Sequence, residues 1–404
     1  PTSIEPLSNV HVIRSNAEAI EIASAYADRI RPDASARDAN RTRPADEILD
    51  LRQTGLLGIM VPRQYGGPQA TIRTLVDVFR IISAADPAIG QIPQNHFSHL
   101  ENIRVLGTDY QKDFFYGGVL AGGMWGNALS ERGTKGGYAG MKTRIVRKPD
   151  GSYVLNGRKF YTTGALFAQW IPVAALDEHD RAHMVMVERR APGVEIIDDW
   201  NGMGQRGTAS GTGIFTDVEV PVEHVVGIHR YDSAPTTRLA FGQIMHIAVD
   251  IGIAEEALAD TVNYIRTKSR PWHGADLATA GDDPHTIRRI GELKVQIEAA
   301  KALLFHAADT FDAALAQPIE EKATINVAIL VAAAKAAASA IAVQVSNDLF
   351  QLAGTSAADE SWNLNRHWRN ARTHTLHDPE VWKYHYIGDF VLNGRTPPRQ
   401  ALIV

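Results

Sequence analysis

The hydrophobic and polar positions of the chain divide it into three parts with different periods. Up to about residue 120, apolar side chains recur every three or four residues, which is the spacing of one helix face. The plainest stripe consists of Ile72, Leu75, Val78, Phe79 and Ile82. The pattern predicts an N-terminal α-helical domain over residues 1–120.

From residue 121 the helical period stops, and short apolar runs alternate with turn signals. Asp150-Gly151 and Asn156-Gly157 are dipeptides that favour tight hairpin turns. The apolar and β-branched runs near such turns predict strands at residues 153–155, 159–163, 183–187 and 213–220. The sequence therefore predicts a central β domain over residues 121–228.

After residue 235 the helical period returns. One long stripe consists of Ile290, Leu293, Ile297, Ala300, Leu304 and Phe311. Residues 320–352 are rich in alanine, and their longest apolar run is interrupted by Lys335 and Gln344. We therefore expect a buried helix there and not a membrane span. These patterns predict a C-terminal helical bundle over residues 229–404.

Composition excludes several classes of function. A formal net charge of −5 over 404 residues argues against a dedicated nucleic-acid binder, which normally carries a basic surplus. The chain has no cysteine, which excludes disulfides, thiolate metal sites and a cysteine nucleophile. Its first residues lack the basic start and apolar run of a signal peptide, so we expect a cytoplasmic protein with no membrane partner.

The densest polar cluster lies at residues 366–379. Three arginines there recur at every third residue, which places them along one helix face, and we expect their role to be structural. His374, His377 and Asp378 follow, and Pro379 ends the element because proline disfavours a helical conformation of the residue before it. These three side chains form a candidate metal site, but no second cluster completes a ligand shell, so we predict no metal.

Three other stretches carry groups that can bind or activate a ligand. His96 can act as a general base or hydrogen-bond to a substrate, or it can be an ordinary structural histidine. Asn127 and Ser130 lie beside small residues that allow a planar ligand to approach the backbone. Thr163 precedes a glycine at the end of a predicted strand, where its hydroxyl can contact a ring nitrogen, although β-propensity alone also explains it.

A basic stretch and a glycine-rich stretch can each be interpreted either as a ligand-binding site or as an ordinary structural feature. Arg270 ends a basic stretch just before a proline and can bind a phosphate, but a solvated helix end explains such residues equally well. Residues 202–207 formally match the GxGxxG dinucleotide pattern. They lie in the predicted β region with no helix after them, so we expect no dinucleotide-binding fold.

Two motifs resemble those of the acyl-CoA dehydrogenase family. One is Gly-Leu-Leu-Gly-Ile-Met-Val-Pro followed by Tyr-Gly-Gly at residues 55–67, and the other spans residues 204–221 with Arg-Gly-Thr and Phe-Thr-Asp-Val. The resemblance covers nearly the whole chain. It implies an α+β, mainly α fold with an N-terminal helical domain, a central β-barrel domain and a C-terminal four-helix bundle.

The chain departs from that family's dehydrogenases in two places. Their proton-abstracting glutamate lies in a C-terminal Tyr-Glu-Gly-Thr-like motif, where this chain has histidines at residues 374–379. Their Arg-x-x-Phe-Gly phrase is replaced by Arg270-Pro271-Trp272. These departures resemble the flavin-dependent monooxygenase branch of the fold, within it most closely the dibenzothiophene monooxygenases. The likeness is carried by residues 198–200, 266–272, 283–288, 368–379 and 392–394.

This resemblance implies roles for individual residues. Thr163 is expected beside the flavin N5, His96 on the substrate side and His377 near the flavin C4a, and these three are the implied catalytic residues. The implied cofactor-binding residues are Asn127, Ser130, Thr163, Trp200, Arg270, His374 and Asp378. Among them, Arg270 and His374 are expected on the phosphate side, from this subunit or a neighbouring one. Around Ser356 the related enzymes carry an arginine, so one phosphate contact is expected to be lost or replaced.

The implied function is that of a two-component monooxygenase. Reduced FMN, with FAD as the second choice, comes from a separate NAD(P)H-dependent flavin reductase and reacts with O₂ to a C4a-hydroperoxyflavin. That species then oxygenates a small organosulfur or aromatic substrate. The alternatives are an FAD-dependent acyl-CoA dehydrogenase with a displaced base and a non-catalytic scaffold that keeps the fold. The resemblance also implies a homotetramer, although the alanine-rich helix would suit a monomeric bundle equally well.

Overall fold

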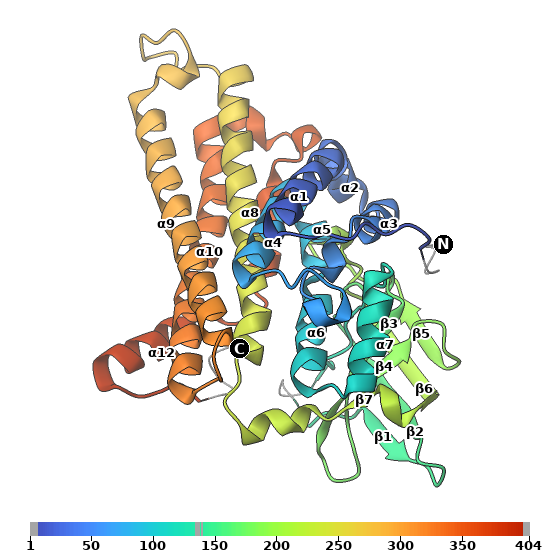
Figure 1. The fold of residues 1–404 in the computed structure, drawn as a ribbon. Helices are drawn as coiled ribbons and strands as arrows, with labels where there is room; N and C mark the ends of the chain where they lie inside the picture. The colour runs from blue at the N-terminus through green and yellow to red at the C-terminus, as the bar shows by residue number, and fades with distance from the viewer. Residues whose placement is uncertain (1–6, 134–137, 139, 399–404) are drawn as a thin grey trace.

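The chain folds into helices, a sheet and a second set of helices, in that order (Figure 1). The computed structural model describes residues 7–133, 138 and 140–398. The helices before the sheet are α1 (Asn16–Ile30), α2 (Ala34–Asn40), α3 (Ala45–Gln53), α4 (Ile72–Ala85), α5 (Pro87–Gln91), α6 (Gln94–Leu106) and α7 (Asp109–Leu120). The order of elements confirms the predicted fold class.

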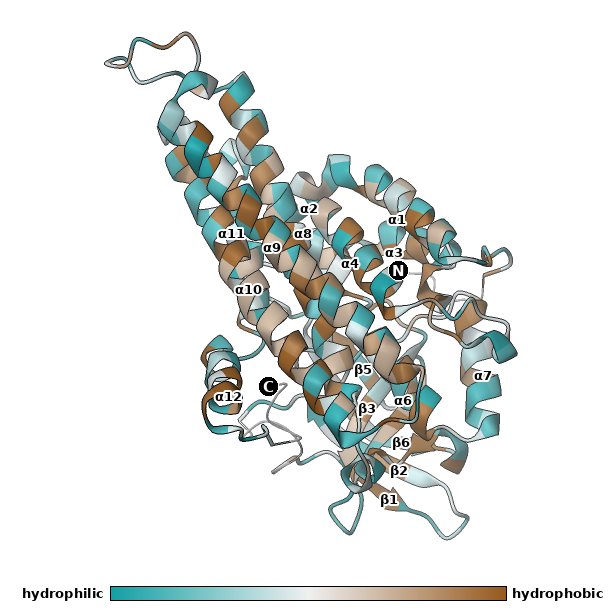
Figure 2. Cartoon of the chain, turned by 60° about the vertical axis from the view of Figure 1, so that its left-hand side comes forward, coloured by the Kyte–Doolittle hydropathy of each residue, from teal (hydrophilic) through white to brown (hydrophobic). Residues whose placement is uncertain are grey.

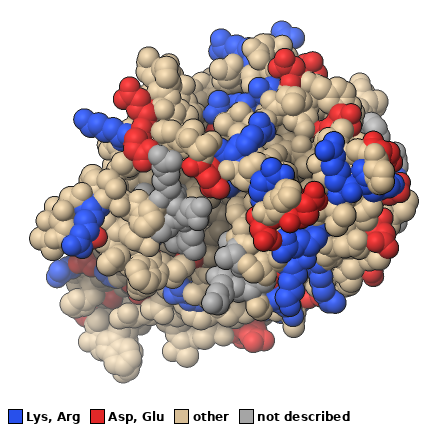
Figure 3. Space-filling view, turned by 90° about the horizontal axis from the view of Figure 1, so that it is seen from below, with Lys and Arg blue, Asp and Glu red and all other residues tan. Residues whose placement is uncertain are grey.

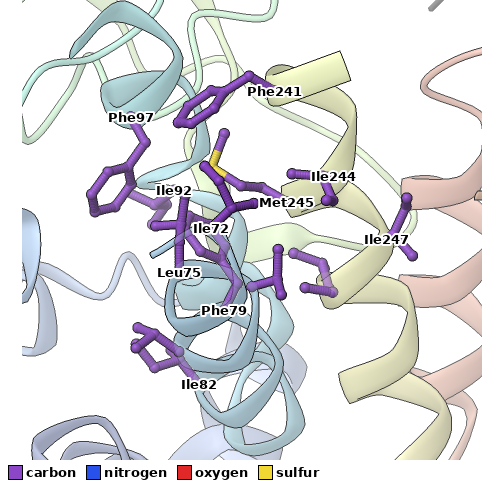
Figure 4. Close-up of a cluster of buried hydrophobic side chains, with 14 of the residues drawn as sticks. Ile72, Leu75, Phe79, Ile82, Ile92, Phe97, Phe241, Ile244, Met245 and Ile247 are labelled. Atoms are coloured by element: carbon purple, nitrogen blue, oxygen red, sulfur yellow. The ribbon is translucent and has the colours of Figure 1, made fainter. Parts of the chain in front are cut away.

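The predicted apolar stripe of α4 is confirmed, and it forms the centre of the N-terminal core. All five of its residues are buried. They pack against α8, which supplies Phe241, Ile244, Met245 and Ile247 (Figure 4). Because α8 belongs to the C-terminal bundle, this contact joins the two helical parts through a single continuous core.

The strands form one seven-stranded sheet in the order β5-β6-β2-β1-β3-β4-β7. The strands are β1 (Arg144–Arg147), β2 (Tyr153–Lys159), β3 (Trp170–Leu176), β4 (Ala182–Glu188), β5 (Val194–Ile197), β6 (Thr212–Val220) and β7 (Val225–Val226). All neighbours are antiparallel except β1 and β3. In the described residues β5 and β7 are not paired with each other, so the predicted barrel is a sheet with two edges.

The strand predicted at residues 159–163 is wrong beyond its first residue. Strand β2 ends at Lys159, and the chain then turns, with Tyr161 at a φ of 57°. Alternating β-formers misled the prediction because a non-glycine residue in the left-handed region leaves no trace in the hydrophobic pattern. The turn carries Thr163, one of the predicted site residues.

The C-terminal helices form a bundle beside the rest of the molecule (Figures 1 and 2). They are α8 (Arg238–Thr267), α9 (Pro284–Leu315), α10 (Glu321–Ala353), α11 (Asn365–Thr375) and α12 (Glu380–Asn393). In the predicted stripe of α9, Leu293, Ile297, Ala300, Leu304 and Phe311 are buried, and Ile290 is partly so. Helix α10 is long and apolar enough to cross a membrane, but 61% of its most apolar window is buried in the protein, as in the core helix of a bundle.

The lower surface of the molecule carries acidic and basic side chains side by side (Figure 3). This mixture agrees with the small formal net charge of −5. A protein that binds nucleic acid through its backbone phosphates presents a basic face, and this view shows none.

Candidate active site

A cavity of about 620 Å³ lies between the sheet and helices α5, α6, α8 and α11. Its lining residues are Gln91, Gln94, Asn95, Ser98, His99, Asn102, Asn127, Leu129, Ser130, Tyr161, Thr163, Trp200, Met203, Gln205, Thr208, Ser210, Arg238, Leu239, Gly242, Gln243, His246, Thr373, His374, Leu376 and His377. Six of the nine predicted site residues are in this set. No aspartate or glutamate is among the described residues that line the cavity.

The turn after β2 brings three hydroxyl groups together on the sheet side of the cavity. The Thr163 and Ser210 hydroxyl oxygens are 2.7 Å apart, as are those of Ser210 and Thr208. Thr208 in turn donates to the carbonyl oxygen of Gln205 at 3.0 Å. This series of hydrogen bonds fixes the rotamer of Thr163, so the Thr163 hydroxyl is held at one place in the cavity wall.

Two aromatic side chains and an amide form the wall next to these hydroxyls. Trp200 donates its ring N–H to the carbonyl oxygen of Gln205 at 2.9 Å, and its ring centroid lies 6.0 Å from that of Tyr161. The amide nitrogen of Asn127 donates to the Tyr161 carbonyl at 3.3 Å, and the Asn127 Oδ1 has no hydrogen-bond partner in the described part of the chain. The wall thus combines flat rings with a free acceptor.

A buried ion pair supports the segment that carries Ser130. The ammonium of Lys159 donates to Glu131 and to the Leu129 carbonyl, both at 3.0 Å. Burial raises the pKa of Glu131, but bonds from Thr143, Lys142 and Lys159 outweigh it and lower that pKa to about 2. Glu131 is therefore a fixed anion with a structural partner and not a free base.

Helix α11 is held by ion pairs from two of the three predicted arginines. Arg369 binds Asp38 of α2 with two hydrogen bonds, of 2.6 and 3.1 Å. Arg366 binds Asp260 of α8 at 2.5 Å. The predicted structural role of the arginine face is confirmed for these two, and it fixes the position from which His374 and His377 reach the cavity.

His377 follows the end of α11 and lies in the cavity wall against a second histidine. Its ring centroid is 4.2 Å from that of His246 in α8, and its Nδ1 is 3.1 Å from Asp378. Asp378 is buried beneath it and pairs with Lys383 at 2.6 Å. Burial raises the pKa of Asp378, but His377, Lys335 and Lys383 outweigh it and hold that pKa below the ordinary value. Asp378 is a charged support of His377 and does not line the cavity.

His374 lies inside the protein between His246 and a carboxylate. Its Nδ1 is 2.5 Å from Asp250 of α8, and its Nε2 is 2.9 Å from Nδ1 of His246. Asp250 also pairs with the ammonium of Lys335 at 2.7 Å. With both ring nitrogens bonded, His374 has none left for a phosphate, so the structure does not place it in the role expected of it.

The order of these bonds fixes where protons lie. Burial raises the pKa of Asp250, but Lys335 and His374 outweigh it and keep the carboxyl ionised, so His374 donates from Nδ1. A neutral His374 then accepts at Nε2 from Nδ1–H of His246, which leaves Nε2 of His246 as an acceptor. Burial, and then the charges of His377 and His374, lower the pKa of His246 well below its usual value, so it is neutral.

Besides Asp378, two predicted site residues lie outside the cavity lining. Both ring nitrogens of His96 are bonded to backbone: Nε2 donates to the Leu57 carbonyl at 2.9 Å, and Nδ1 accepts from the Trp125 N–H at 3.1 Å. His99, one turn later, lines the cavity in its place. Arg270 is exposed in the connection between α8 and α9, at the end of the bundle far from the sheet (Figure 1).

Several lining residues were missed by reasoning from sequence. His246 lies inside the apolar run of α8, and Gln205, Thr208 and Ser210 lie in a loop with no regular period. Only a buried polar residue in an otherwise apolar helix stretch marks His246, and such residues are usually structural. Within the described residues no group of three or more histidine, aspartate and glutamate side chains is arranged to hold a metal ion.

The cavity fits the ring system of a flavin. Trp200 and Tyr161 offer flat surfaces, the hydroxyl of Thr163 is fixed, and the buried oxygens of Asn127 and Gln205 have no partner among the described residues. Buried polar atoms without partners are uncommon in native proteins. A planar heterocycle with several donors and acceptors at its rim would satisfy them.

Comparison with known proteins agrees with this geometry. Three consecutive domains of the acyl-CoA dehydrogenases match the chain: the N-terminal domain at residues 19–123, the middle domain at residues 126–218 and the C-terminal domain at residues 244–379. Together they span the helical part, the sheet and the bundle described above.

Comparison with individual proteins shows which branch of this fold the chain resembles. Dibenzothiophene monooxygenase of Rhodococcus erythropolis is 32% identical over 94% of each chain. A probable FMNH2-dependent monooxygenase, SfnC, of Pseudomonas putida is 30% identical over 94% of this chain and 96% of its own. The crystal structure of FMN-bound TdsC from Paenibacillus sp. A11-2 superposes with a TM-score of 0.91 and 26% identity, over 95% of this chain and 99% of that one. The chain belongs to the flavin-dependent monooxygenases of the acyl-CoA dehydrogenase fold.

Proposed function

We propose that the chain is the oxygenase of a two-component system that uses reduced FMN and O₂ to oxygenate a small organosulfur compound. The observation that carries the proposal is a flavin-sized cavity with a fixed hydroxyl, a histidine cluster and no lining carboxylate among the described residues. FMN is the flavin because TdsC is an FMN-bound relative and SfnC is a probable FMNH2-dependent one.

Reduced FMN, when bound, would supply the two electrons with which one atom of O₂ is inserted into the substrate and the other is released as water. The lining residues that would hold its ring are Asn127, Ser130, Tyr161, Thr163 and Trp200. Thr163 presents a hydroxyl in one orientation, because Ser210 holds it. A fixed donor needs no reorganisation when charge develops next to it, which is the general source of electrostatic catalysis.

The histidine cluster controls protons. His377 is half-exposed toward the cavity and its Nδ1 is bonded to the ionised Asp378, so it can donate or accept a proton at its remaining nitrogen. His246 offers a neutral acceptor beside it, and the bonds through His374 to Asp250 keep that tautomer. The cluster can thus take up a proton from the reacting centre without any carboxylate in the cavity.

The dehydrogenase alternative lacks the type of base that the related dehydrogenases use. Their base is a glutamate, and no carboxylate is among the described residues that line this cavity. Asp378 is the nearest carboxylate in sequence to the usual place, and it is buried against Lys383. Its charge is already satisfied, so it does not act as that base.

A separate NAD(P)H-dependent reductase is proposed as the source of reduced FMN. The glycine-rich residues 202–207 lead into the three-residue 3-10 helix η4, and among the described residues no glycine-rich loop leads from a strand into an α-helix, which is the usual binding place of a dinucleotide. The substrate, O₂ and this reductase are the partners of the reaction.

The test follows the oxygen atom. The purified protein is combined with an unrelated flavin reductase, NADH, FMN or FAD, isotopically labelled O₂ and dibenzothiophene or a dialkyl thioether. We expect labelled sulfoxide, with FMN more effective than FAD. Bleaching of tightly bound FAD by an acyl-CoA without oxygen would support the dehydrogenase instead. If no flavin bound at micromolar concentrations, the result would support the alternative of a non-catalytic scaffold that keeps the fold.

We also propose that the protein is a homotetramer. Helix α12 buries Lys383 and packs Tyr386 and Ile387 on α10, yet Val381, Val391 and Leu392, outside that contact, are exposed by 71%, 77% and 83%. A helix with apolar side chains both on its packed face and on its exposed surface has room for a second partner. A further copy of the chain is the proposed one, and Arg270 would then be available to a neighbouring subunit.

A further inference from the structure

The part of the cavity between α6 and α8 contains a positive charge without a matching carboxylate. Arg238, the first residue of α8, lines the cavity there. It donates to the Tyr138 hydroxyl at 2.8 Å, and its guanidinium carbon lies 5.2 Å from the ring centroid of Tyr231. Among the described residues no aspartate or glutamate pairs with Arg238. An arginine that lines a cavity without a counterion is suited to bind an anion.

A buried histidine, His99, is held near this arginine by a short series of hydrogen bonds. The Tyr231 hydroxyl donates to Oδ1 of Asn102 at 3.1 Å, which turns the amide nitrogen of Asn102 toward Nδ1 of His99 at 3.4 Å. Nδ1 also lies 3.1 Å from the sulfur of Met184, so it either donates to that sulfur or accepts from Asn102, and Nε2 takes the complementary role in the neutral ring. Nε2 is buried on the side of the ring that faces the Asn127 amide.

His99 stays neutral in this place. Burial lowers its pKa to about 3 against a smaller opposing effect of Asn127, and the charge of Arg238 lowers it further. The ring is therefore a hydrogen-bonding group with no charge of its own, near a permanent cation. The other side chains around them are the amides and hydroxyl of Gln91, Gln94, Asn95 and Ser98, which are also polar and uncharged.

The anion site and the histidine cluster lie at different points along α8. Arg238 and His246 are eight residues apart, which is about 12 Å along a helix axis. Both side chains lean toward the N-terminus of the helix, so the separation of their polar groups is similar. A ligand that reaches both places must have its charged group and its reacting atom several bonds apart.

We propose that this part of the cavity binds the anionic end of the substrate, and that the substrate class is small thioethers with a carboxylate or sulfonate at the far end. The inference rests on the proposed monooxygenase function. In the reaction the thioether sulfur gains one oxygen atom of O₂. The other oxygen atom leaves as water with two protons, and reduced FMN provides the two electrons.

The test compares charged and uncharged substrates of the same shape. A homologous series of ω-(methylthio)alkanoates and their methyl esters is assayed with the complete system of protein, flavin reductase, FMN and NADH. We expect each acid to have a KM about tenfold or more below that of its ester, and one chain length to be best. In Arg238→Gln this ratio falls to about one, because a charged hydrogen bond is lost. Arg238→Lys restores part of it.

The matched control is Arg158→Gln, which removes an exposed arginine of β2 and should leave the ratio as in the wild type. Binding is also measured by calorimetric titration of the acids into the protein without turnover, where Arg238→Gln should abolish the heat. Equal KM values for acid and ester, or calorimetric binding that is unchanged in Arg238→Gln, would overturn the anion site. If the esters or dibenzothiophene were still oxygenated, the monooxygenase function would remain supported. Binding of the acids without oxygenation of any thioether would overturn the monooxygenase and keep the anion site.

Discussion

At the scale of single residues, the site depends on side chains whose orientation is fixed by neighbours outside the cavity. Thr163 is held by Ser210, His377 by Asp378, and His246 by His374. Each of these supports can be removed by one substitution. The expected consequences differ, because the role proposed for Thr163 is to stabilise a bound flavin and the role proposed for His377 is to transfer a proton.

His377→Ala should separate oxygen consumption from product formation. Without an imidazole at this place the proton balance at the reacting centre is lost, and general acid–base groups typically contribute about a hundredfold or more to a rate. We expect a similar fall in sulfoxide formation, with the consumed O₂ recovered as hydrogen peroxide. The ratio of peroxide to product is the measurement, and His179→Ala, an exposed histidine, is the control. Unchanged coupling would remove His377 from the mechanism.

Thr163→Val tests the fixed hydroxyl with almost no change of shape. Valine removes the donor and leaves Ser210 with one bond fewer, at a cost of about 1 kcal/mol in stability. We expect this variant to release more hydrogen peroxide per O₂ consumed than the wild type. We also expect FMN to raise its melting temperature by less than it raises that of the wild type. Thr163→Ser keeps the hydroxyl and should behave as the wild type. Equal peroxide release by the valine and serine variants would count against a role for this hydroxyl.

At the scale of elements, the cavity depends on how closely the loop before η4 (Arg206–Thr208) approaches α11. A side chain at Gly204 would overlap the carbonyl oxygen of Arg369. The amide N–H of Gln205 donates to Oδ1 of Asn370 at 2.7 Å, which joins the same two elements. The loop that carries Trp200 and Ser210 is thereby set against the helix that carries His374.

Gly204→Ala should move this loop away from α11. Overlap with backbone cannot be relieved by a rotamer change, so we expect about 1–3 kcal/mol of destabilisation and weaker FMN binding. Thermal unfolding and fluorescence titration with FMN measure the two effects. Gly117→Ala in α7 is the control, because nothing lies within 4 Å of its added methyl group and alanine favours a helix. If the Gly204→Ala variant bound FMN as tightly as the wild type, the close approach of this loop to α11 would not be needed for FMN binding.

Elements with a regular period were predictable, and the site was predictable only where it follows from them. The stripes of α4 and α9 could be read from sequence because every third or fourth side chain faces one core. His377 was found because a polar cluster ends at a proline. His99 and His246 were missed, since the sequence does not say which of two histidines on α6 faces a ligand, or that a polar residue of α8 faces a cavity. Such facts depend on distant elements.

At the scale of the whole molecule, three buried histidines make stability depend on pH. Burial lowers the pKa of His96 and His367 to about 4 and that of His99 to about 3. The unfolded chain binds these protons near pH 6.5, so between pH 6.5 and about 4 it holds more protons than the folded one. Stability is then complete above pH 6.5 and falls as pH decreases, by about 1.4 kcal/mol per pH unit and histidine.

Three such residues would remove most of a typical folding free energy within about two pH units. We therefore expect cooperative acid unfolding near pH 5, measured by urea unfolding at a series of pH values. His96→Gln should lower stability at neutral pH and make the pH dependence shallower, because glutamine has no proton to gain. His179→Gln, at an exposed position, should leave the slope unchanged. Stability that stays constant down to pH 5 would show that these rings are protonated in the folded state.

The outer face of α12 gives the last prediction, which concerns assembly. Val391→Glu places a charge beside Leu392 on the exposed surface of α12, and a carboxylate that is buried in an interface without a partner is strongly unfavourable. If four copies pack through this surface, the variant should elute as a smaller species in size-exclusion chromatography with light scattering, and its thermal stability should depend less on protein concentration than that of the wild type. Val146→Glu is the matched control, because this valine of β1 is 59% exposed on the sheet, away from α12 (Figure 1). A wild-type protein that is monomeric at micromolar concentration, or a Val391→Glu variant that remains a tetramer, would exclude this face as the interface.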